Sequence, residues 1–174
     1  IQMAQNNIQA QLIKHIPGFL KEEKANDLCA VLEAIIPWQK FAPSPKSRLI
    51  YMWNTLIAQM VDPQINQIFQ KLIHKINRKY RTNIQNIFCN LYKNGQDYCP
   101  YHKDMYGTHI FTLSLGQTRD FLVKPDQKGT KATKYTLNSG DLYFMHNDIH
   151  KTHKHSIPKR KHVEGTRISI VFFC

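Results

Sequence analysis

The stretch HIFTLSLGQTRDFLV, residues 109–123, contains two short runs of apolar and β-branched residues separated by a turn signal. The first run covers residues 109–115, Gly116 marks the turn, and the second run covers residues 119–123. Runs of this length that are bounded by glycine and polar residues favour strands over helices. The stretch therefore predicts two neighbouring β-strands.

Similar segments fill the chain from about residue 84 to its end. Each is rich in β-branched or aromatic residues, and turn signals such as Asn94-Gly95 and Ser139-Gly140 separate them. The further predicted strands are residues 86–92, 134–137, 141–146, 151–157 and 166–174. Seven or eight short strands in succession predict a sandwich or a jelly roll.

The chain before residue 84 has a different pattern. Apolar residues recur at helical spacing, which predicts helices over residues 8–16, 21–36 and 64–81. Residues 49–53 are predicted as a short strand, and residues 41–48, which contain two prolines, as an exposed loop. Helices followed by strands predict an α+β chain, and a length of 174 residues suits a single domain.

The composition indicates a basic protein without a membrane span. The formal charge of +12 attracts polyanions, so nucleic acid is the expected partner. The chain begins at Ile1 without a secretory signal, which suggests a piece of a longer polypeptide. Its four cysteines are too sparse for a disulfide framework, so we expect an intracellular monomer, cytoplasmic or nuclear.

The pair His102 and Asp104 has the spacing of two metal ligands. Residues i and i+2 of a strand project to the same side, and a mixed imidazole and carboxylate set suits iron(II). Spacing alone leaves the third ligand open, because five histidines lie downstream: His146, His150, His153, His155 and His162. Within the predicted strand 151–157, His153 and His155 share one face.

From Asn90 onward the chain resembles the AlkB-type 2-oxoglutarate/Fe(II)-dependent dioxygenases, which are oxidative nucleic-acid demethylases. The resemblance covers residues 84–174 and is weaker upstream. Its motifs, in order, are Asn90-Leu91-Tyr92 with His102-Lys103-Asp104, Leu113-Ser114-Leu115-Gly116 with Arg119-Asp120-Phe121, Ser139-Gly140-Asp141-Leu142, His155-Ser156-Ile157-Pro158 and Arg167.

The resemblance implies a double-stranded β-helix (jelly-roll) core over residues 84–174, with N-terminal helices packed on it. Residues 1–83 would supply those helices and a nucleotide-recognition lid. The metal, Fe(II), would be held by His102, Asp104 and His155. Of the two cosubstrates, dioxygen and 2-oxoglutarate, the latter would have its far carboxylate on Arg167. Further cosubstrate contacts would come from Asn90, Tyr92 and Ser169.

The sequence departs from the family pattern at two places. Phe173 stands where the family usually carries a second arginine, so the cosubstrate pocket would have one cation fewer. That change would reduce affinity or activity unless a neighbouring lysine such as Lys124 compensates. Met105-Tyr106 replaces an acidic residue that reads the base, which leaves the base preference open.

The nucleotide-binding side of the site is predicted upstream. Lys46 and Arg48 would contact phosphates, and Tyr51 and Trp53 would form a stacking wall for a base lifted from its stack. The alternative interpretation is that both aromatic residues belong to the core. Basic residues at 128, 131, 134 and 159–162 could follow a nucleic-acid backbone.

The function that these residues predict is oxidative demethylation of N-alkylated bases in RNA or single-stranded DNA, with release of succinate, CO2 and formaldehyde. Two alternatives stay open. One is a 2-oxoglutarate oxygenase acting on protein. The other is a non-catalytic nucleic-acid-binding module with a degenerate site or a structural zinc.

Overall fold

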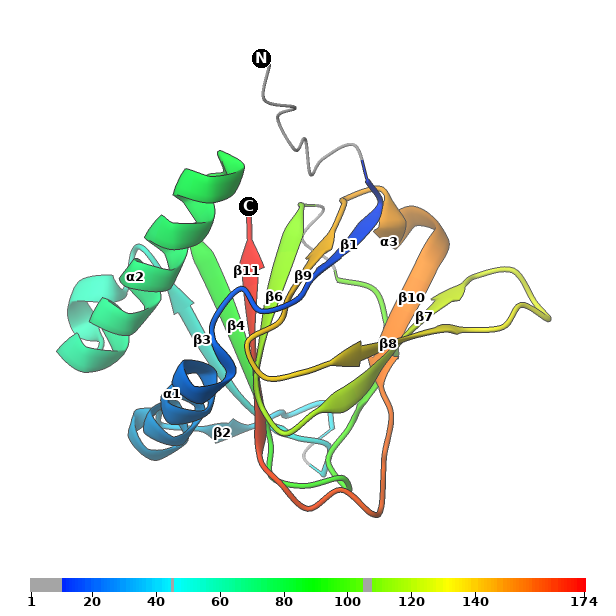
Figure 1. Ribbon diagram of the computed structural model, residues 1–174, viewed down its shortest axis with the longest axis horizontal. Coiled ribbons are helices and arrows are strands. Elements are labelled where there is room, and N and C mark those ends of the chain that lie inside the picture. The colour runs from blue at the N-terminus through cyan, green and yellow to red at the C-terminus, as the bar shows by residue number, and fades with distance from the viewer. Residues whose placement is uncertain (1–10, 45, 105–107) are drawn as a thin grey trace.

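Two antiparallel sheets face each other in the computed structural model, which describes residues 11–44, 46–104 and 108–174 (Figure 1). The larger sheet contains, in spatial order, β1 (Ile13–Ile16), β9 (Leu142–Met145), β6 (Ile110–Gly116), β11 (Arg167–Phe173), β4 (Asn86–Tyr92), β3 (Leu49–Asn54) and β2 (Gln39–Lys40). The smaller sheet contains β5 (Cys99–His102), β10 (His153–Ile157), β7 (Arg119–Pro125) and β8 (Thr133–Leu137). This is the antiparallel sandwich that the strand-rich half of the sequence predicts.

The central strand β11 separates the core from the space between the sheets. Successive residues of a strand point to opposite faces. Ile168, Ile170 and Phe172 are fully buried in the main hydrophobic core, on the face that the helices cover. The alternate residues, from Arg167 to Phe173, line a cavity on the other face.

Two long helices cover the outer face of the larger sheet, as Figure 1 shows. They are α1 (Glu22–Ile35) and α2 (Pro63–Tyr80), close to the predicted bounds, and the short elements η2 (Ala58–Met60) and α3 (Ile149–Thr152) complete the set among the described residues. The Asp62 side chain begins α2 by accepting hydrogen bonds from the backbone N–H groups of residues 64 and 65. Within the described chain, no helix is both long and apolar enough to cross a membrane.

The predicted helix over residues 8–16 is wrong where the structure describes it. Ile13–Ile16 form β1, which pairs along its whole length with β9; residues 1–10 lie outside the described part. Four residues with apolar ends fit either periodicity, and pairing with β9 decides the outcome. The N-terminal half thus contributes β1, β2 and β3 to the larger sheet.

The loop over residues 41–48 is exposed only in part. Ser47 and Arg48 are buried, because the Ser47 carbonyl accepts a hydrogen bond from the Tyr98 N–H and Arg48 points into the cavity. The strand β5 was not among the predicted segments, although His102 and Asp104 were expected on a strand or at its end; β5 ends at His102, and Asp104 lies beyond it. It contains Pro100 and lies at the edge of the smaller sheet, where a proline is tolerated.

We expect Gly140→Ala to lower the free energy of unfolding by about 2 to 4 kcal/mol, measured by urea denaturation. Gly140 has a φ of +92°, and a Cβ there would lie 2.2 Å from the Leu20 carbonyl oxygen. Gly129→Ala is the matched control, since its φ is +82° but no atom lies within 4 Å of the added Cβ. The control should cost only about 1 to 2 kcal/mol. Equal losses would show that the contact with Leu20 is unimportant.

Candidate active site

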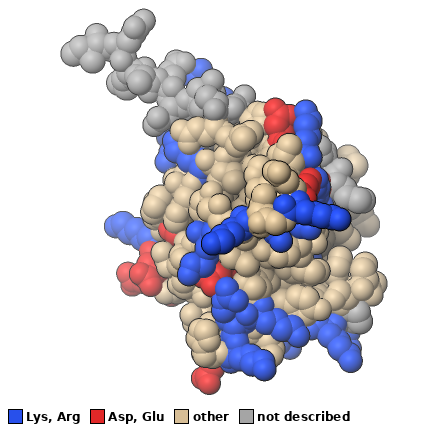
Figure 2. Space-filling view, turned by 90° about the vertical axis from the view of Figure 1, so that its right-hand side faces the viewer, with Lys and Arg blue, Asp and Glu red and all other residues tan. Residues whose placement is uncertain are grey.

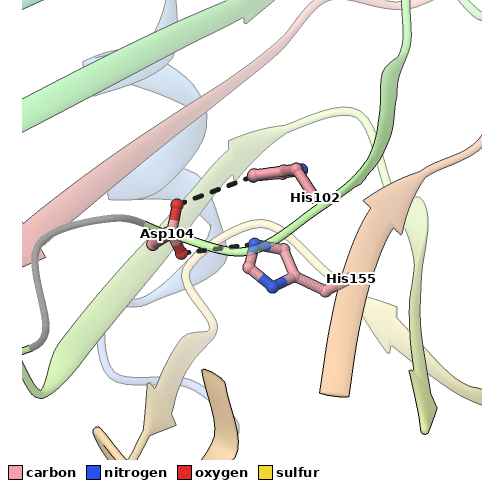
Figure 3. A group of neighbouring side chains, drawn as sticks. All are labelled: His102, Asp104 and His155. Atoms are coloured by element: carbon pink, nitrogen blue, oxygen red, sulfur yellow. Dashed lines mark ion pairs between the residues drawn. The ribbon is translucent and has the colours of Figure 1, made fainter. Parts of the chain in front are cut away.

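Strand pairing brings His102 and His155 together. The two residues are Cα partners on the antiparallel strands β5 and β10, and Asp104 follows two residues after the end of β5. Asp104 Oδ1 lies 3.6 Å from His102 Nε2, and Oδ2 lies 3.3 Å from His155 Nε2 (Figure 3). One ligand atom from each residue lies within 4.8 Å of the other two. The carboxylate thus stands between two imidazoles, as in a site for one cation.

The charges of the three side chains are strongly coupled. Burial lowers the pKa of His102, but hydrogen bonds to Asp104 and Cys99 outweigh it and raise the pKa to about 10. Burial raises the pKa of Asp104, but its hydrogen bonds to both histidines lower that pKa by more, so the pKa falls well below its usual range. His155, more deeply buried, has a lowered pKa. The Asp104 carboxylate and the neutral His155 imidazole already have the protonation states that bind a metal. His102 has to lose a proton before it binds one.

A further contact orients His102. Its Nδ1 donates a hydrogen bond to the Pro100 carbonyl oxygen at 2.8 Å, which leaves Nε2 directed at Asp104. Backbone contacts of this kind fix the orientation of metal-ligating histidines. The donor set, its spacing and this orientation together fit a divalent metal such as iron(II).

The structure separates His155 from the four other histidines that spacing left open. His153 shares its strand, but its Nδ1 lies 2.7 Å from the Thr152 hydroxyl. The His146 ring lies 4.4 Å from the His109 ring between centroids, and His150 lies 5.9 Å from His155 between ring centroids without joining the ligand group. Among the described residues, the cluster contains His155 alone of the five.

Arg167 lies in the same cavity, which has a volume of about 380 Å³ and is lined by both sheets. Arg167 is 1% exposed, and its guanidinium donates from Nε to Ser114 Oγ at 2.9 Å and lies 5.3 Å from the centre of the Tyr92 ring. Burial lowers its pKa to about 10. Its Nη1 has no hydrogen-bond partner among the described residues, and no described carboxylate pairs with it. Since an unpaired buried cation is costly, the site fits a ligand carboxylate.

The other predicted cosubstrate residues surround Arg167. Tyr92 is the Cα partner of Arg167, and Asn90 is the partner of Ser169 across β4 and β11. The Asn90 side-chain amide donates to Ser169 Oγ at 3.1 Å, and all four residues line the cavity. The structure therefore brings the four residues to the cavity that also contains the metal-ligand group.

The cavity contains a second buried arginine that the sequence placed elsewhere. Arg48 is 7% exposed and donates from Nε to Asn90 Oδ1 at 2.6 Å, so it lies beside the cosubstrate residues rather than on an exposed loop. Phe173 lines the same cavity. Lys124 cannot supply the missing charge, because its strand neighbour Val123 points inward and Lys124 points to the opposite face. Arg48 is a second buried arginine in the lining of this cavity.

The predicted stacking wall is wrong. Tyr51 and Trp53 are Cα partners of Cys89 and Ile87, on the face of the larger sheet that the helices cover. Trp53 is 1% exposed and packs edge-on against Phe69, at 5.9 Å between ring centroids. The alternative interpretation, that both aromatic residues belong to the core, is therefore correct.

Two other predictions for the nucleotide-binding side concern Lys46 and the base preference. Lys46 is exposed. The base preference was left open because of residues 105 and 106, which lie outside the described part of the chain.

We expect Trp53→Ala to destabilise the protein by about 3 to 5 kcal/mol, because it removes a large fully buried side chain. The neighbouring Met52 is 57% exposed on the other face, so Met52→Ala should change stability by about 0.5 kcal/mol or less. Chemical denaturation compares the two variants. If Trp53→Ala left stability unchanged and weakened nucleic-acid binding, the result would instead support a stacking role for Trp53.

Two residues at the site had no predicted role. Tyr143 on β9 lines the cavity opposite Thr112, and burial raises the pKa of its hydroxyl far above its usual range. Arg119 donates hydrogen bonds to the carbonyls of Asn94, Asp97 and Pro158, and so ties the loop before β5 to the loop after β10. The alternation of β9 could have indicated Tyr143, whereas three backbone contacts leave no mark in a sequence.

Solved structures share this fold over nearly the whole chain. The Pseudomonas putida prolyl-4-hydroxylase superposes with a TM-score of 0.60 at 13% identity, covering 97% of this chain and 95% of that one. OsALKBH1 superposes with a TM-score of 0.60 at 15% identity, covering 94% of this chain and 98% of that one. At these identities the likeness concerns the fold.

Sequence comparisons identify relatives with a named activity. The human alpha-ketoglutarate-dependent dioxygenase alkB homolog 3 is 23% identical over 181 residues, 90% of this chain and 63% of its own length. The Arabidopsis thaliana DNA oxidative demethylase ALKBH2 is 30% identical over 149 residues, 70% of this chain and 45% of its own. The chain thus spans less than two thirds of these relatives.

The family assignment rests on a match along almost the entire sequence. The family model of the 2OG-Fe(II) oxygenase superfamily matches residues 13–172. Members of this family use Fe(II), 2-oxoglutarate and dioxygen, which agrees with the His-Asp-His group and with a cavity arginine that has no ion pair in the described part of the chain. The chain belongs to the 2OG-Fe(II) oxygenase superfamily and is an AlkB-type member of it.

Proposed function

We propose that this protein oxidatively removes N-alkyl groups from bases in RNA or single-stranded DNA, converting 2-oxoglutarate to succinate and CO2 and releasing formaldehyde. The observation that carries the proposal is a cavity lined by a metal-ligand triad and by a buried arginine that has no ion pair among the described residues. The names of the human and Arabidopsis relatives, a dioxygenase and a DNA oxidative demethylase, support the reaction class.

The cavity has residues suited to bind the metal and residues suited to bind the cosubstrate. His102, Asp104 and His155 would bind Fe(II), which together with 2-oxoglutarate and dioxygen supplies the oxidising power for hydroxylating an N-alkyl carbon. Arg167 would bind the far carboxylate of 2-oxoglutarate, because it lines the cavity and its buried Nη1 has no hydrogen-bond partner among the described residues. The adjacent Ser169 and Asn90 add hydrogen-bonding groups on the same face.

The residues around the triad would admit a base from solvent into a mostly apolar cavity. The side chains of His102 and Lys103 are 36% and 38% exposed, so the cavity reaches solvent at this segment. Deeper in, the lining is mostly apolar and includes Phe88, Phe121 and Tyr143. A base has to leave its stack to reach such a site, which favours single-stranded substrates.

The test is to incubate the protein with Fe(II), 2-oxoglutarate and oligonucleotides that carry N-methylated bases, and to measure succinate, formaldehyde and the repaired base. We expect the three products in equal amounts, and little succinate with unmethylated oligonucleotides. A methylated peptide serves as the competing substrate. Succinate formation with the peptide alone, or no repaired base across several lesions, would refute the proposal.

A further inference from the structure

The face of the smaller sheet that points away from the cavity carries a row of lysines. His155 and Val123 are Cα partners on β10 and β7 and are buried toward the cavity. Their strand neighbours Lys154 and Lys124 are also partners, so both point outward. On β8, Lys134 is the partner of Leu122, which has the same orientation as Lys124.

An exposed aromatic ring continues this row to the edge strand. His102 faces the cavity, so Tyr101 before it points to the outer face, where it is 40% exposed. The Lys154 ammonium lies 5.8 Å from the centre of the Tyr101 ring. We call Lys124, Lys134, Lys154 and Tyr101 the lysine face. Figure 2 views the side of the molecule on which β7, β8 and β10 lie, and basic side chains spread across it with fewer acidic ones.

The acidic residues near the lysine face are already paired with other cations. Asp120, on the same side of β7, accepts from Arg160 at 2.6 and 2.7 Å, and Asp126 pairs with Lys103. None of the three lysines has an ion pair among the described residues. Like charges placed directly opposite each other on neighbouring strands destabilise a sheet, so the Lys124 and Lys154 pair is unfavourable for folding alone. A polyanion across the face would relieve that repulsion.

The lysine face begins beside the opening of the cavity. Tyr101 precedes the triad residue His102, and Lys103, the next residue, lines the cavity and is part exposed. Neighbouring strands lie about 4.8 Å apart, so the row from β5 across β10 and β7 to β8 extends about 14 Å away from the opening. Spaced cations with an exposed ring suit a phosphate backbone and a stacked base.

We propose that the lysine face binds the single-stranded segment that flanks the target base, holding its phosphates with Lys124, Lys134 and Lys154 and stacking one base on Tyr101. The identity of the target base rests on the proposed function, whereas binding of the flanking strand does not require turnover.

The experiment compares two triple variants of equal charge change. The first is Lys124→Gln, Lys134→Gln and Lys154→Gln. The control is Lys24→Gln, Lys71→Gln and Arg78→Gln, which removes three exposed charges from α1 and α2 on the far side of the larger sheet. Binding of an unmethylated single-stranded oligonucleotide is measured by fluorescence anisotropy as a function of salt. Demethylation of a methylated trinucleotide and of a longer oligonucleotide is measured in parallel.

We expect the lysine-face variant to bind the oligonucleotide about ten-fold or more weakly at about 50 mM salt, with a slope of log affinity against log salt reduced by about 2, as three lost phosphate contacts require. The control should bind like the wild type. Turnover of the trinucleotide should be unchanged, while turnover of the longer oligonucleotide at low concentration should fall. Tyr101→Leu should weaken binding about five-fold or more, and Tyr101→Phe should not.

Equal losses in both triple variants would overturn the inference, because only net charge would matter. Loss of trinucleotide turnover in the lysine-face variant would also overturn it, as would displacement of the oligonucleotide by polyglutamate at a lower charge concentration than by nucleic acid. The two proposals can fail separately. If the wild type repairs no base, and only the lysine-face variant binds the oligonucleotide more weakly, the proposed function is refuted and this inference is supported.

Discussion

His155→Ala will lower the rate of 2-oxoglutarate turnover by at least about a thousand-fold. His155 lies on β10, whereas His102 ends β5 and Asp104 follows it, and the His155 imidazole is the only third donor within reach of the pair among the described residues. A bound metal contributes several kcal/mol to the reaction, and each 1.4 kcal/mol corresponds to a factor of about ten in rate. Metal content and succinate formation measure the loss.

His153→Ala is the matched control for this variant. His153 lies on the same strand and face, two residues away, but its ring contacts Thr152. We expect its metal content and turnover to stay within about two-fold of wild type, because surface substitutions away from a site change little. If His155→Ala kept its metal and turnover while His153→Ala lost them, the third ligand would be His153 and not His155.

Arg167→Met will weaken 2-oxoglutarate binding by a factor between about 30 and 5,000. Truncating one partner of a buried, hydrogen-bonded charge pair costs about 2 to 5 kcal/mol. The folded protein without cosubstrate should lose little stability, since Arg167 is 1% exposed and its Nη1 has no hydrogen-bond partner among the described residues. Replacing an unpaired buried cation with an apolar side chain of similar length should leave stability within about 1 kcal/mol.

Two measurements separate binding from folding in this variant. Thermal denaturation without cosubstrate reports stability, and the rise in Tm on adding 2-oxoglutarate reports binding. Arg167→Lys keeps a charge but loses the planar pair of donors, so its affinity should fall between wild type and Arg167→Met. A large Tm rise with 2-oxoglutarate in Arg167→Met would show that another residue, such as Arg48, anchors the carboxylate.

Most of the strands that carry the site were predictable, because seven segments after residue 84 have strong local signals. The strand β5 was missed, since Pro100 argues against a strand unless its place at a sheet edge is known. The segment Ile13–Ile16 was taken for a helix because its pairing partner β9 lies far along the chain. Long-range pairing is the information that a local pattern lacks.

The same limit explains which site residues were placed correctly. His102 and Asp104 stand together in sequence, and the ordered motifs selected His155 and Arg167. The spacing of Tyr51 and Trp53 showed that they share a face but not which face, and only the register with β4 turns them toward the helices. Arg48 was assigned to phosphates because its burial depends on Asn90, 42 positions along the chain.

The central claim is that His102, Asp104 and His155 bind one Fe(II) in the cavity where Arg167 binds 2-oxoglutarate. The most direct measurement is an anaerobic titration of the metal-free protein with Fe(II) in the presence of 2-oxoglutarate, followed by the visible absorption of the keto acid chelated to iron. We predict saturation at one equivalent, with the absorption lost in His155→Ala and kept in His153→Ala. Full absorption in His155→Ala, or none in the wild type, would contradict the account.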